Sequence, residues 1–197
     1  MSNSGAQAQA DKWNSRFADT SAAGAASAVL AENTHLLPAK GRALDLACGT
    51  GGNGLLLATH GLTTVLWDIS AVALEKQQTW GSEQGLVLET QERDCENDPP
   101  PPGSFDVISV AHFLHRPLFP ALQAALRPGG VLFYQTFTAN KLDPGGPGSP
   151  DFLLQPGELL ALLPGLAPRF YREEDRCGDL ARGDRNRAML VAQKPLD

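Results

Sequence analysis

The sequence predicts a single α/β domain built on a doubly wound, mostly parallel sheet of seven strands, with an antiparallel hairpin at its C-terminal end. Two observations support this prediction. Strand-like apolar runs alternate with helical patterns roughly every 20–25 residues, as in a parallel sheet whose strands are joined by crossover helices. The last two strand-like segments have no helical pattern between them, and strands joined in that way pair antiparallel. The length of 197 residues suits one large domain, so we treat residues 1–197 as a single unit.

The parallel strands are predicted by runs of apolar and β-branched residues bounded by glycine, proline or acidic residues. Five such runs are present, at residues 42–47, 63–67, 86–90, 105–111 and 131–137. Helical patterns occupy residues 11–37, 55–58, 71–80, 117–127 and 156–163. Pro38 and Gly41 end the first helical segment. The segments RFYREED and NRAMLVAQK predict the C-terminal hairpin, joined by a tight polar turn, and the four prolines at 99–102 predict a stiff connector.

The composition argues against several classes of protein. The chain has 16 Lys and Arg residues against 22 Asp and Glu, a net charge of −6, and no basic cluster that predicts a nucleic-acid partner. No run approaches the ~20 apolar residues of a membrane span, and the opening MSNSGAQAQADKW lacks the pattern of a secretory signal. Cys48, Cys95 and Cys177 are far apart and form no CxxC pair. We therefore expect reduced thiols, a cytoplasmic protein, and no metal site.

A glycine-rich loop follows the first predicted strand. Residues 45–54 read DLACGTGGNG, and Gly49, Gly51 and Gly54 satisfy the G-x-G-x-x-G pattern of dinucleotide-binding folds. Asp68 ends the second strand, where an acid that binds ribose hydroxyls is expected. Glycine has no Cβ, so the backbone can turn tightly and approach a ligand closely. These residues alone are also compatible with an NAD(P)-dependent oxidoreductase.

Asp45, at the end of the first strand, distinguishes two classes of cofactor. A carboxylate beside a pyrophosphate is repelled in a partly dry site, whereas it attracts the sulfonium and ammonium groups of S-adenosylmethionine. Asp68 can accept from both ribose hydroxyls of either cofactor, and Asp94, after the third strand, can accept from the adenine amino group. Three acids at the ends of successive strands lie where open α/β sheets bind ligands.

The ordered motifs resemble those of class I S-adenosylmethionine-dependent methyltransferases: LDLACGTGG, VLWDIS, ERDCEN, FDVISVAHFLHR and LRPGGVLFYQTF. The resemblance covers residues 42–138 and extends to the last strand. It implies a Rossmann-like methyltransferase fold and S-adenosyl-L-methionine as cofactor. Alanine stands at position 47, where the family more often has glycine. The implied cofactor-binding residues are Trp13, Arg16, Asp45, Ala47, Gly49, Gly51, Asn53, Asp68, Ile69, Asp94, Cys95 and Ala111.

Four further segments are similar to the small tellurite-resistance and thiopurine-type methyltransferases: GTGGNGLLLATHG, TVLWDISAVAL, FLLQPGELLALL and the opening KWNSRF. This similarity implies a small-molecule acceptor with a soft nucleophile, such as a thiol or a chalcogen oxyanion. We expect a monomer or homodimer with no nucleic-acid or membrane partner. The sequence departs from the tellurite pattern at LARGD, which offers Arg182 without the neighbouring histidine. Tellurite itself is therefore not predicted.

Methyl transfer from a sulfonium depends mainly on in-line positioning, which contributes roughly 7–11 kcal/mol. A thiolate arrives deprotonated, so no catalytic dyad or triad is expected. The candidates on the acceptor side are His112 after the fourth strand, Tyr134 near the end of the fifth, and Arg182 as part of an anion clamp. Two alternatives stay open: the NAD(P)-dependent oxidoreductase, and a non-catalytic S-adenosylmethionine-binding partner subunit.

Two segments at the edges of the domain are expected to be flexible. Residues 1–10 are expected to be disordered before the helical segment 11–37. Residues 139–155 form a turn-rich loop over the active site, in the place where this fold often carries a substrate lid. We expect that loop to be mobile without ligand, and proteolysis that is indifferent to cofactor would contradict this expectation.

Overall fold

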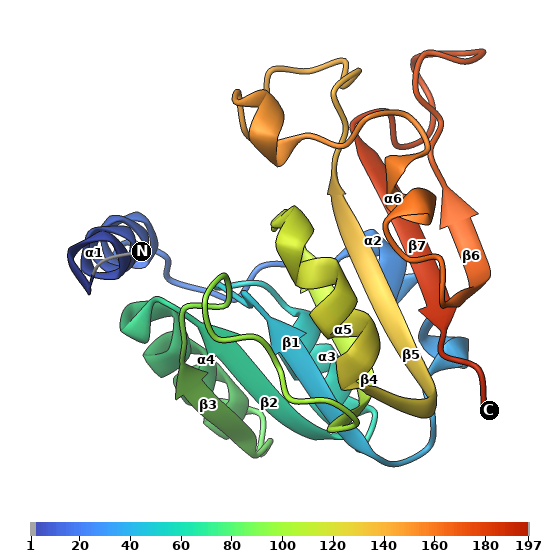
Figure 1. The fold of residues 1–197 in the computed structure, drawn as a ribbon. Helices are drawn as coiled ribbons and strands as arrows, with labels where there is room; N and C mark the ends of the chain where they lie inside the picture. The colour runs from blue at the N-terminus through green and yellow to red at the C-terminus, as the bar shows by residue number, and fades with distance from the viewer. Residues whose placement is uncertain (1–2, 197) are drawn as a thin grey trace.

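The computed structural model describes residues 3–196, which form one sheet of seven strands in the order β3-β2-β1-β4-β5-β7-β6 (Figure 1). The strands are β1 Arg42–Leu46, β2 Thr63–Asp68, β3 Leu88–Glu92, β4 Phe105–Ala111, β5 Leu126–Phe137, β6 Ala167–Arg172 and β7 Arg187–Gln193. β1 to β5 pair in parallel, and β7 runs antiparallel to both β5 and β6. The fold class predicted from the sequence is confirmed.

Helices cover both faces of the sheet (Figure 1). α5 and α6 lie on one face, and α2, α3 and α4 lie on the other. The helices are α1 Asn3–Phe17, α2 Ala28–Ala31, α3 Asn53–Thr59, α4 Ala71–Glu83, α5 Phe119–Ala125 and α6 Glu158–Ala161, with short 3₁₀ turns at Thr34–Leu36, Arg116–Leu118 and Pro150–Phe152. Within residues 3–196, no helix combines the length and apolar character needed to cross a membrane. The strand order reverses between β1 and β4, which places the ligand crevice of such sheets at their carboxyl ends.

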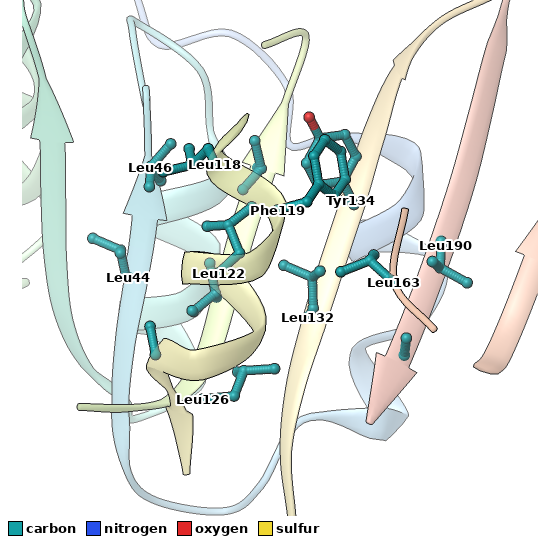
Figure 2. Packing of buried hydrophobic residues seen from close by; sticks show 14 of the residues in the cluster. Leu44, Leu46, Leu118, Phe119, Leu122, Leu126, Leu132, Tyr134, Leu163 and Leu190 are labelled. Atoms are coloured by element: carbon teal, nitrogen blue, oxygen red, sulfur yellow. The ribbon is translucent and has the colours of Figure 1, made fainter. Parts of the chain in front are cut away.

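The core on the α5 face fixes the position of β1 and β5 (Figure 2). Phe119 and Leu122 of α5 lie in one buried cluster with Leu44 of β1 and Leu132 of β5. Each such side chain contributes about 1.5–3 kcal/mol when it is fully buried. The strand ends that carry the polar residues are therefore held by a rigid apolar layer.

The connection from β3 to β4 contains no helix, as the proline-rich sequence predicts. Arg93, at its start, places its guanidinium 4.1 Å from the centre of the Trp67 ring. Trp67 is 3% exposed and also meets Phe105 edge-on. The irregular segment after β3 therefore covers Trp67 through a cation–π contact, whereas helices cover the other strands of the parallel sheet.

The N-terminal expectations are corrected in two respects. Residues 3–10 belong to α1 and are not disordered, while residues 1–2 lie outside the described part of the chain. The alanine-rich sequence favours a helix, and Gln7 donates to Asp11 one turn later at 2.9 Å. Residues 11–37 are not one helical segment, because α1 ends at Phe17 and the next ten residues are irregular. Their backbone bonds to the glycine loop, with the Gly24 N–H donating to the Thr50 carbonyl at 2.8 Å.

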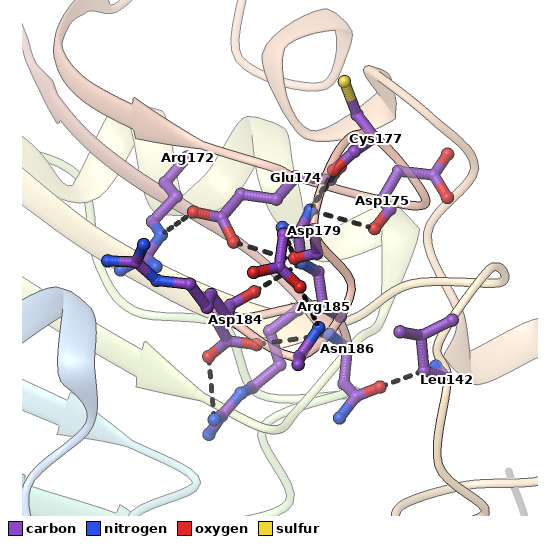
Figure 3. Close-up of polar contacts among 12 residues, drawn as sticks. Leu142, Arg172, Glu174, Asp175, Cys177, Asp179, Asp184, Arg185 and Asn186 are labelled. Atoms are coloured by element: carbon purple, nitrogen blue, oxygen red, sulfur yellow. Dashed lines mark hydrogen bonds and ion pairs between the residues drawn. The ribbon is translucent and has the colours of Figure 1, made fainter.

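The C-terminal hairpin is confirmed, but the tight turn is wrong, because residues 173–186 form a long loop between β6 and β7. Arg185 organises this loop (Figure 3). Its guanidinium group donates to the carbonyls of Cys177 and Asp179, each at 2.7 Å, and to that of Arg182 at 2.6 Å. A single, partly exposed guanidinium therefore bridges carbonyls along this loop in place of the hydrogen bonds of a short turn.

Candidate active site

The glycine loop between β1 and α3 is held from two sides. Ala47 and Gly49 have φ angles of 53° and 49°, in the left-handed region. The Gly49 N–H donates to Asp68 Oδ2 at 2.8 Å, and Gln77 Nε2 donates to the carbonyls of Gly49 and Gly51 at 3.1 and 2.6 Å. A left-handed conformation costs alanine roughly 1–2 kcal/mol, a cost that glycine at position 47 would avoid.

Asp68 lies at the end of β2 and is 6% exposed. Oδ2 accepts from Gly49, and Oδ1 accepts from the Ser70 N–H at 2.8 Å. Burial raises the pKa of the Asp68 carboxyl, and hydrogen bonds from the backbone of Ser70, Gly49 and Ile69 oppose that rise. Each carboxylate oxygen has two lone pairs, so both oxygens can accept a further hydrogen bond.

Asp45 lies behind the loop and is 1% exposed. Its Oδ2 has no hydrogen-bond partner among the described residues. Burial raises the pKa of the Asp45 carboxyl from 3.8 to about 7, although hydrogen bonds from Gly54, Asn53 and Ser109 favour the charged form. Asn53 is itself buried, with Oδ1 accepting from the Ser27 N–H at 2.7 Å and Nδ2 donating to Ser109 Oγ at 3.0 Å. The predicted site residue Asn53 therefore supports Asp45 and is not presented at the surface of the site.

The N-terminal segment covers the glycine loop. The Phe17 ring lies 3.0 Å from the position that a Cβ at Gly49 would take, and Trp13 stacks on Phe17 with ring centres 5.6 Å apart. Arg16 is exposed, with its guanidinium 5.7 Å from the Trp13 ring. Sequence reasoning named Trp13 and Arg16 for the site but missed Phe17. The four-residue spacing of Trp13 and Phe17 on one helix face is the signal that points to it.

Asn14 fixes α1 in this position. Its Oδ1 accepts from Ser70 Oγ at 2.7 Å and from the Val72 N–H at 3.2 Å, at the start of α4. Lys76 of α4 adds two hydrogen bonds, from Nζ to the carbonyls of Ala18 and Thr20 at 2.7 and 2.6 Å. The cover over the loop is thus held by polar contacts that do not involve the glycines.

Asp94 and Cys95 follow β3. Asp94 Oδ1 accepts from the Glu96 N–H at 3.1 Å, and Oδ2 accepts from Asn97 Nδ2 at 2.6 Å. Burial raises the pKa of the Cys95 thiol to about 12, and burial also raises the pKa of Cys48. Both thiols therefore stay protonated, which agrees with a packing role for Cys48. Among residues 3–196, no three His, Cys, Asp or Glu side chains gather as a metal site.

His112 follows Ala111 at the end of β4, with a left-handed φ of 57°. Its N–H donates to the Gln135 carbonyl at 2.8 Å, and its Nε2 lies 3.3 Å from Gln135 Nε2. Gln135 Oε1 accepts from the Val29 N–H at 3.0 Å, so the amide nitrogen must face the histidine. His112 Nε2 is then the acceptor, and the ring carries its proton on Nδ1. Burial lowers the pKa of His112, which favours this neutral ring.

Tyr134 and Arg182, the other two candidates on the acceptor side, lie in β5 and in the loop before β7. Tyr134 is 1% exposed and lies in the buried cluster (Figure 2). Its hydroxyl donates to the Phe113 carbonyl at 2.6 Å. Side chains alternate along β5, so Tyr134 enters the core on the α5 face while Gln135 points to the other face. Arg182 is exposed on the loop before β7. No hydrogen bond among the described residues joins either side chain to the glycine loop or to His112, so the proposal below does not use them.

Comparisons with known proteins found a matching domain model and related sequences. Residues 43–130 match a family model described as a methyltransferase domain. Uncharacterised proteins of Mycobacterium tuberculosis and Mycobacterium bovis are 33% identical over 96 residues, which cover 46% of this chain and 35% of theirs. The chain therefore matches only about a third of the length of these curated relatives.

Solved structures share the fold at low sequence identity. A methyltransferase from Methanosarcina mazei has a TM-score of 0.65 at 19% identity, covering 83% of this chain and 97% of its own. TehB from Haemophilus influenzae has a TM-score of 0.64 at 20% identity, covering 94% and 67%. A structure described for the conversion of a disulfide bond into a thioacetal group during echinomycin biosynthesis has a TM-score of 0.70 at 17% identity, covering 96% and 94%. Residues 43–130 thus match a methyltransferase domain, and the described residues share their fold with solved S-adenosylmethionine-dependent methyltransferases.

Proposed function

We propose that the chain transfers the methyl group of S-adenosylmethionine to a small-molecule acceptor. The observation that carries this proposal is the pair of acids behind and beside the glycine loop. Asp45 has an unpartnered oxygen, and Asp68 has free lone pairs on two fixed oxygens. These hydrogen-bond acceptors fit a ligand that has cationic groups and a ribose diol. They do not fit a pyrophosphate, which both carboxylates would repel.

Residues in and around the glycine loop are proposed to hold the cofactor. Asp68 accepts from the ribose hydroxyls, and the backbone of Gly49 and Gly51 allows close approach. Asp45 supplies negative charge from below the loop, while Trp13 and Arg16 close over the methionyl end with Phe17. Ala47, Ile69, Asp94, Cys95 and Ala111 complete the proposed cofactor-binding set.

Methyl transfer from a sulfonium requires little of the protein beyond positioning the cofactor and the acceptor. The sulfonium of the bound cofactor supplies an activated methyl group with its leaving group built in. The chain orients the acceptor, excludes water and keeps the two in line. His112 accepts from Gln135 at Nε2 and holds its proton on Nδ1, so we propose that it positions the acceptor through Nδ1–H and does not act as the base. A soft nucleophile such as a thiolate fits this scheme because it needs no base.

The segment 139–155 is proposed to cover the acceptor. Arg116 fastens it to the end of β4, because its guanidinium donates to the carbonyls of Asp151 and Leu153 at 2.7 and 2.9 Å and pairs with Glu158 at 2.6 Å. Thr138 also forms a bridge with Leu154. Motion of this segment would therefore occur between these fixed points, in residues 140–150.

A transfer assay tests the proposed function. Purified protein with methyl-labelled S-adenosylmethionine is offered thiols, selenite, tellurite and thiopurines, and the methylated products are counted against a reaction without acceptor. We expect turnover with at least one acceptor that has a sulfur or selenium nucleophile. Cofactor binding without turnover of any acceptor would instead favour the non-catalytic partner subunit.

A further inference from the structure

Gln135 lies in a strand with neighbours on both sides and has no exposed surface. In the register of β5 it pairs with Ala111 of β4 and with Met189 of β7. Its side chain enters the layer between β5 and α2, which contains apolar side chains such as Phe133 and Val29 (Figure 1). A buried amide in such a layer destabilises the fold unless its polar atoms are paired, so packing alone does not account for it.

Both polar atoms of the Gln135 amide are paired, each with a different part of the chain. Oε1 accepts from the Val29 N–H at 3.0 Å, and Nε2 lies 3.3 Å from His112 Nε2. A backbone N–H can only donate, so the Val29 contact fixes which end of the amide faces the histidine. The Gln135 carbonyl also accepts from the His112 N–H at 2.8 Å. One residue therefore holds both the main chain and the ring of His112.

His112 has a backbone conformation that requires such support. Its φ angle of 57° lies in the left-handed region, which residues other than glycine keep where their surroundings impose it. The residue as a whole is exposed, and no hydrogen bond among residues 3–196 involves its Nδ1. A molecule from solvent can therefore reach the histidine, and Nδ1–H is the ring donor that the fold leaves unused.

Two charged groups act on His112, one from β7 and one from the loop before it. Partial burial lowers the pKa of the His112 ring most, Arg187 lowers it further, and Asp184 raises it. Arg187 and Asp184 pair with each other at 2.7 Å, so their opposite effects partly cancel. A proton on Nε2 would face the N–H of the Gln135 amide, so the glutamine disfavours it. Gln135 is therefore the contact that distinguishes the two ring nitrogens.

The backbone that holds Gln135 is also bonded to the glycine loop. Two residues before Val29, the Ser27 N–H donates to Asn53 Oδ1 at 2.7 Å. Asn53 begins α3 at the end of the glycine loop and is 5% exposed. Residues 27–29 are thus held by two buried amides, one from the loop and one from β5. The position of the His112 ring is thereby fixed relative to the glycine loop.

We propose that Gln135 is a positioning residue for the methyl transfer: it holds the His112 ring in place relative to the glycine loop, with the ring proton kept on Nδ1 for the acceptor. The inference rests on the proposed function for the role of His112. It rests on the two amide contacts for the orientation and tautomer of the ring. Gln135 itself contacts neither cofactor nor acceptor in this account.

Nuclear magnetic resonance tests the state of the ring without relying on turnover. In the full chain with ¹⁵N-labelled histidine at pH 8, two-bond couplings between protons and nitrogens show which ring nitrogen is protonated, and His112→Asn identifies the signals of His112. We expect one neutral tautomer in the wild type, with the proton on Nδ1. Gln135→Met keeps the length of the side chain and removes both amide contacts, so its His112 ring should populate both tautomers.

Two further variants separate the contact with His112 from the contact with Val29. Gln135→Glu keeps an acceptor for the Val29 N–H and places a carboxylate beside the ring, so His112 should carry a proton on Nε2. Gln193→Met is the matched control, because it removes a paired glutamine at the far end of β7, where Nε2 donates to the Gly129 carbonyl at 2.9 Å. It should leave the His112 tautomer unchanged. Thermal melting checks that each variant is folded.

The transfer assay then measures the consequence for the reaction. With an acceptor that the wild type methylates, Gln135→Met should lower kcat about tenfold or more, because the acceptor is no longer held in line. The KM for S-adenosylmethionine should change by less than about twofold, since the glycine loop is intact. Gln193→Met should keep the wild-type kcat.

Three results would overturn the proposal: a wild-type ring with its proton on Nε2, a Gln135→Met ring that stays protonated on Nδ1 alone, or a Gln135→Met chain that keeps the wild-type kcat. If Gln135→Met does not fold, Gln135→Glu decides, and a ring that keeps its proton on Nδ1 alone contradicts the proposal. Failure of the proposed function is separate. If the tautomers behave as expected and no acceptor is methylated, the control of the His112 ring by Gln135 stands and the methyl transfer does not.

Discussion

Replacing Asp45 by asparagine should make the protein more stable than the wild type at pH 8, by up to ~4 kcal/mol. Asp45 is fully buried with one unpartnered oxygen, and burial raises the pKa of its carboxyl to about 7. At pH 8 the folded protein must therefore hold a charge that water would solvate in the unfolded chain. Asparagine has nearly the same shape and no charge.

The sign of the pH dependence follows from the proton count. Between pH 3.8 and about 7, the folded state keeps the Asp45 proton while the unfolded state has lost it. The free energy of unfolding should consequently fall through this window as the pH rises, because the unfolded state binds fewer protons. At pH 4 the wild type and Asp45→Asn should be nearly equal in stability, and they should diverge above it.

Urea unfolding at pH 4, 6 and 8 measures this divergence. Asp19→Asn, which changes an exposed carboxylate, is the matched control and should leave the pH dependence of the wild type in place. If Asp45→Asn were less stable than the wild type at pH 8, the buried charge would not be a cost in the folded protein. A destabilising buried charge is expected at a residue that serves ligand binding, because binding sites often reduce stability.

Asp68→Ala should weaken the binding of S-adenosylhomocysteine by about 10–100-fold. The substitution removes two functions of the Asp68 side chain. It removes the acceptor that holds Gly49 in place, and it removes the proposed acceptor for the ribose hydroxyls. Hydrogen bonds to a charged group contribute about 1.5–3 kcal/mol each, so both losses lie within reach of calorimetry.

Two controls separate these roles. Gln77→Ala removes the other anchor of the loop, the amide that bonds Gly49 and Gly51, without removing charge, and it should weaken binding less than Asp68→Ala. A 2′-deoxy analogue of the ligand should bind the wild type about tenfold less tightly and should bind Asp68→Ala as well as the parent ligand does. Unchanged discrimination in Asp68→Ala would mean that Asp68 only holds the loop.

The parallel strands and the glycine loop could be predicted because their signals are local. Each strand is a short apolar run, and the glycines stand where the chain turns from β1 into α3. The irregular structure of the residues between α1 and α2 could not be predicted from local signals. Its backbone bonds, such as that of Gly24 to Thr50, join residues far apart in the sequence, and they replace the helix that local propensity favours.

The orientation of the candidates on the acceptor side could not be predicted, for a similar reason. Tyr134 and Gln135 are neighbours in the sequence, yet they point to opposite faces of β5, and the register of the sheet decides which one meets the site. Arg182, Arg185 and Arg187 lie within six residues of one another in the sequence. In the fold they have three different environments: an exposed loop, a fan of loop carbonyls, and the wall of a cavity.

Calorimetry on the wild-type chain tests the central claim most directly. Titration with S-adenosylmethionine and S-adenosylhomocysteine should show micromolar binding, and titration with NAD⁺, NADH, NADP⁺ and NADPH should show none. Binding of a nicotinamide cofactor without binding of S-adenosylmethionine would contradict the account, because Asp45 and Asp68 would then accommodate the pyrophosphate that they are expected to repel.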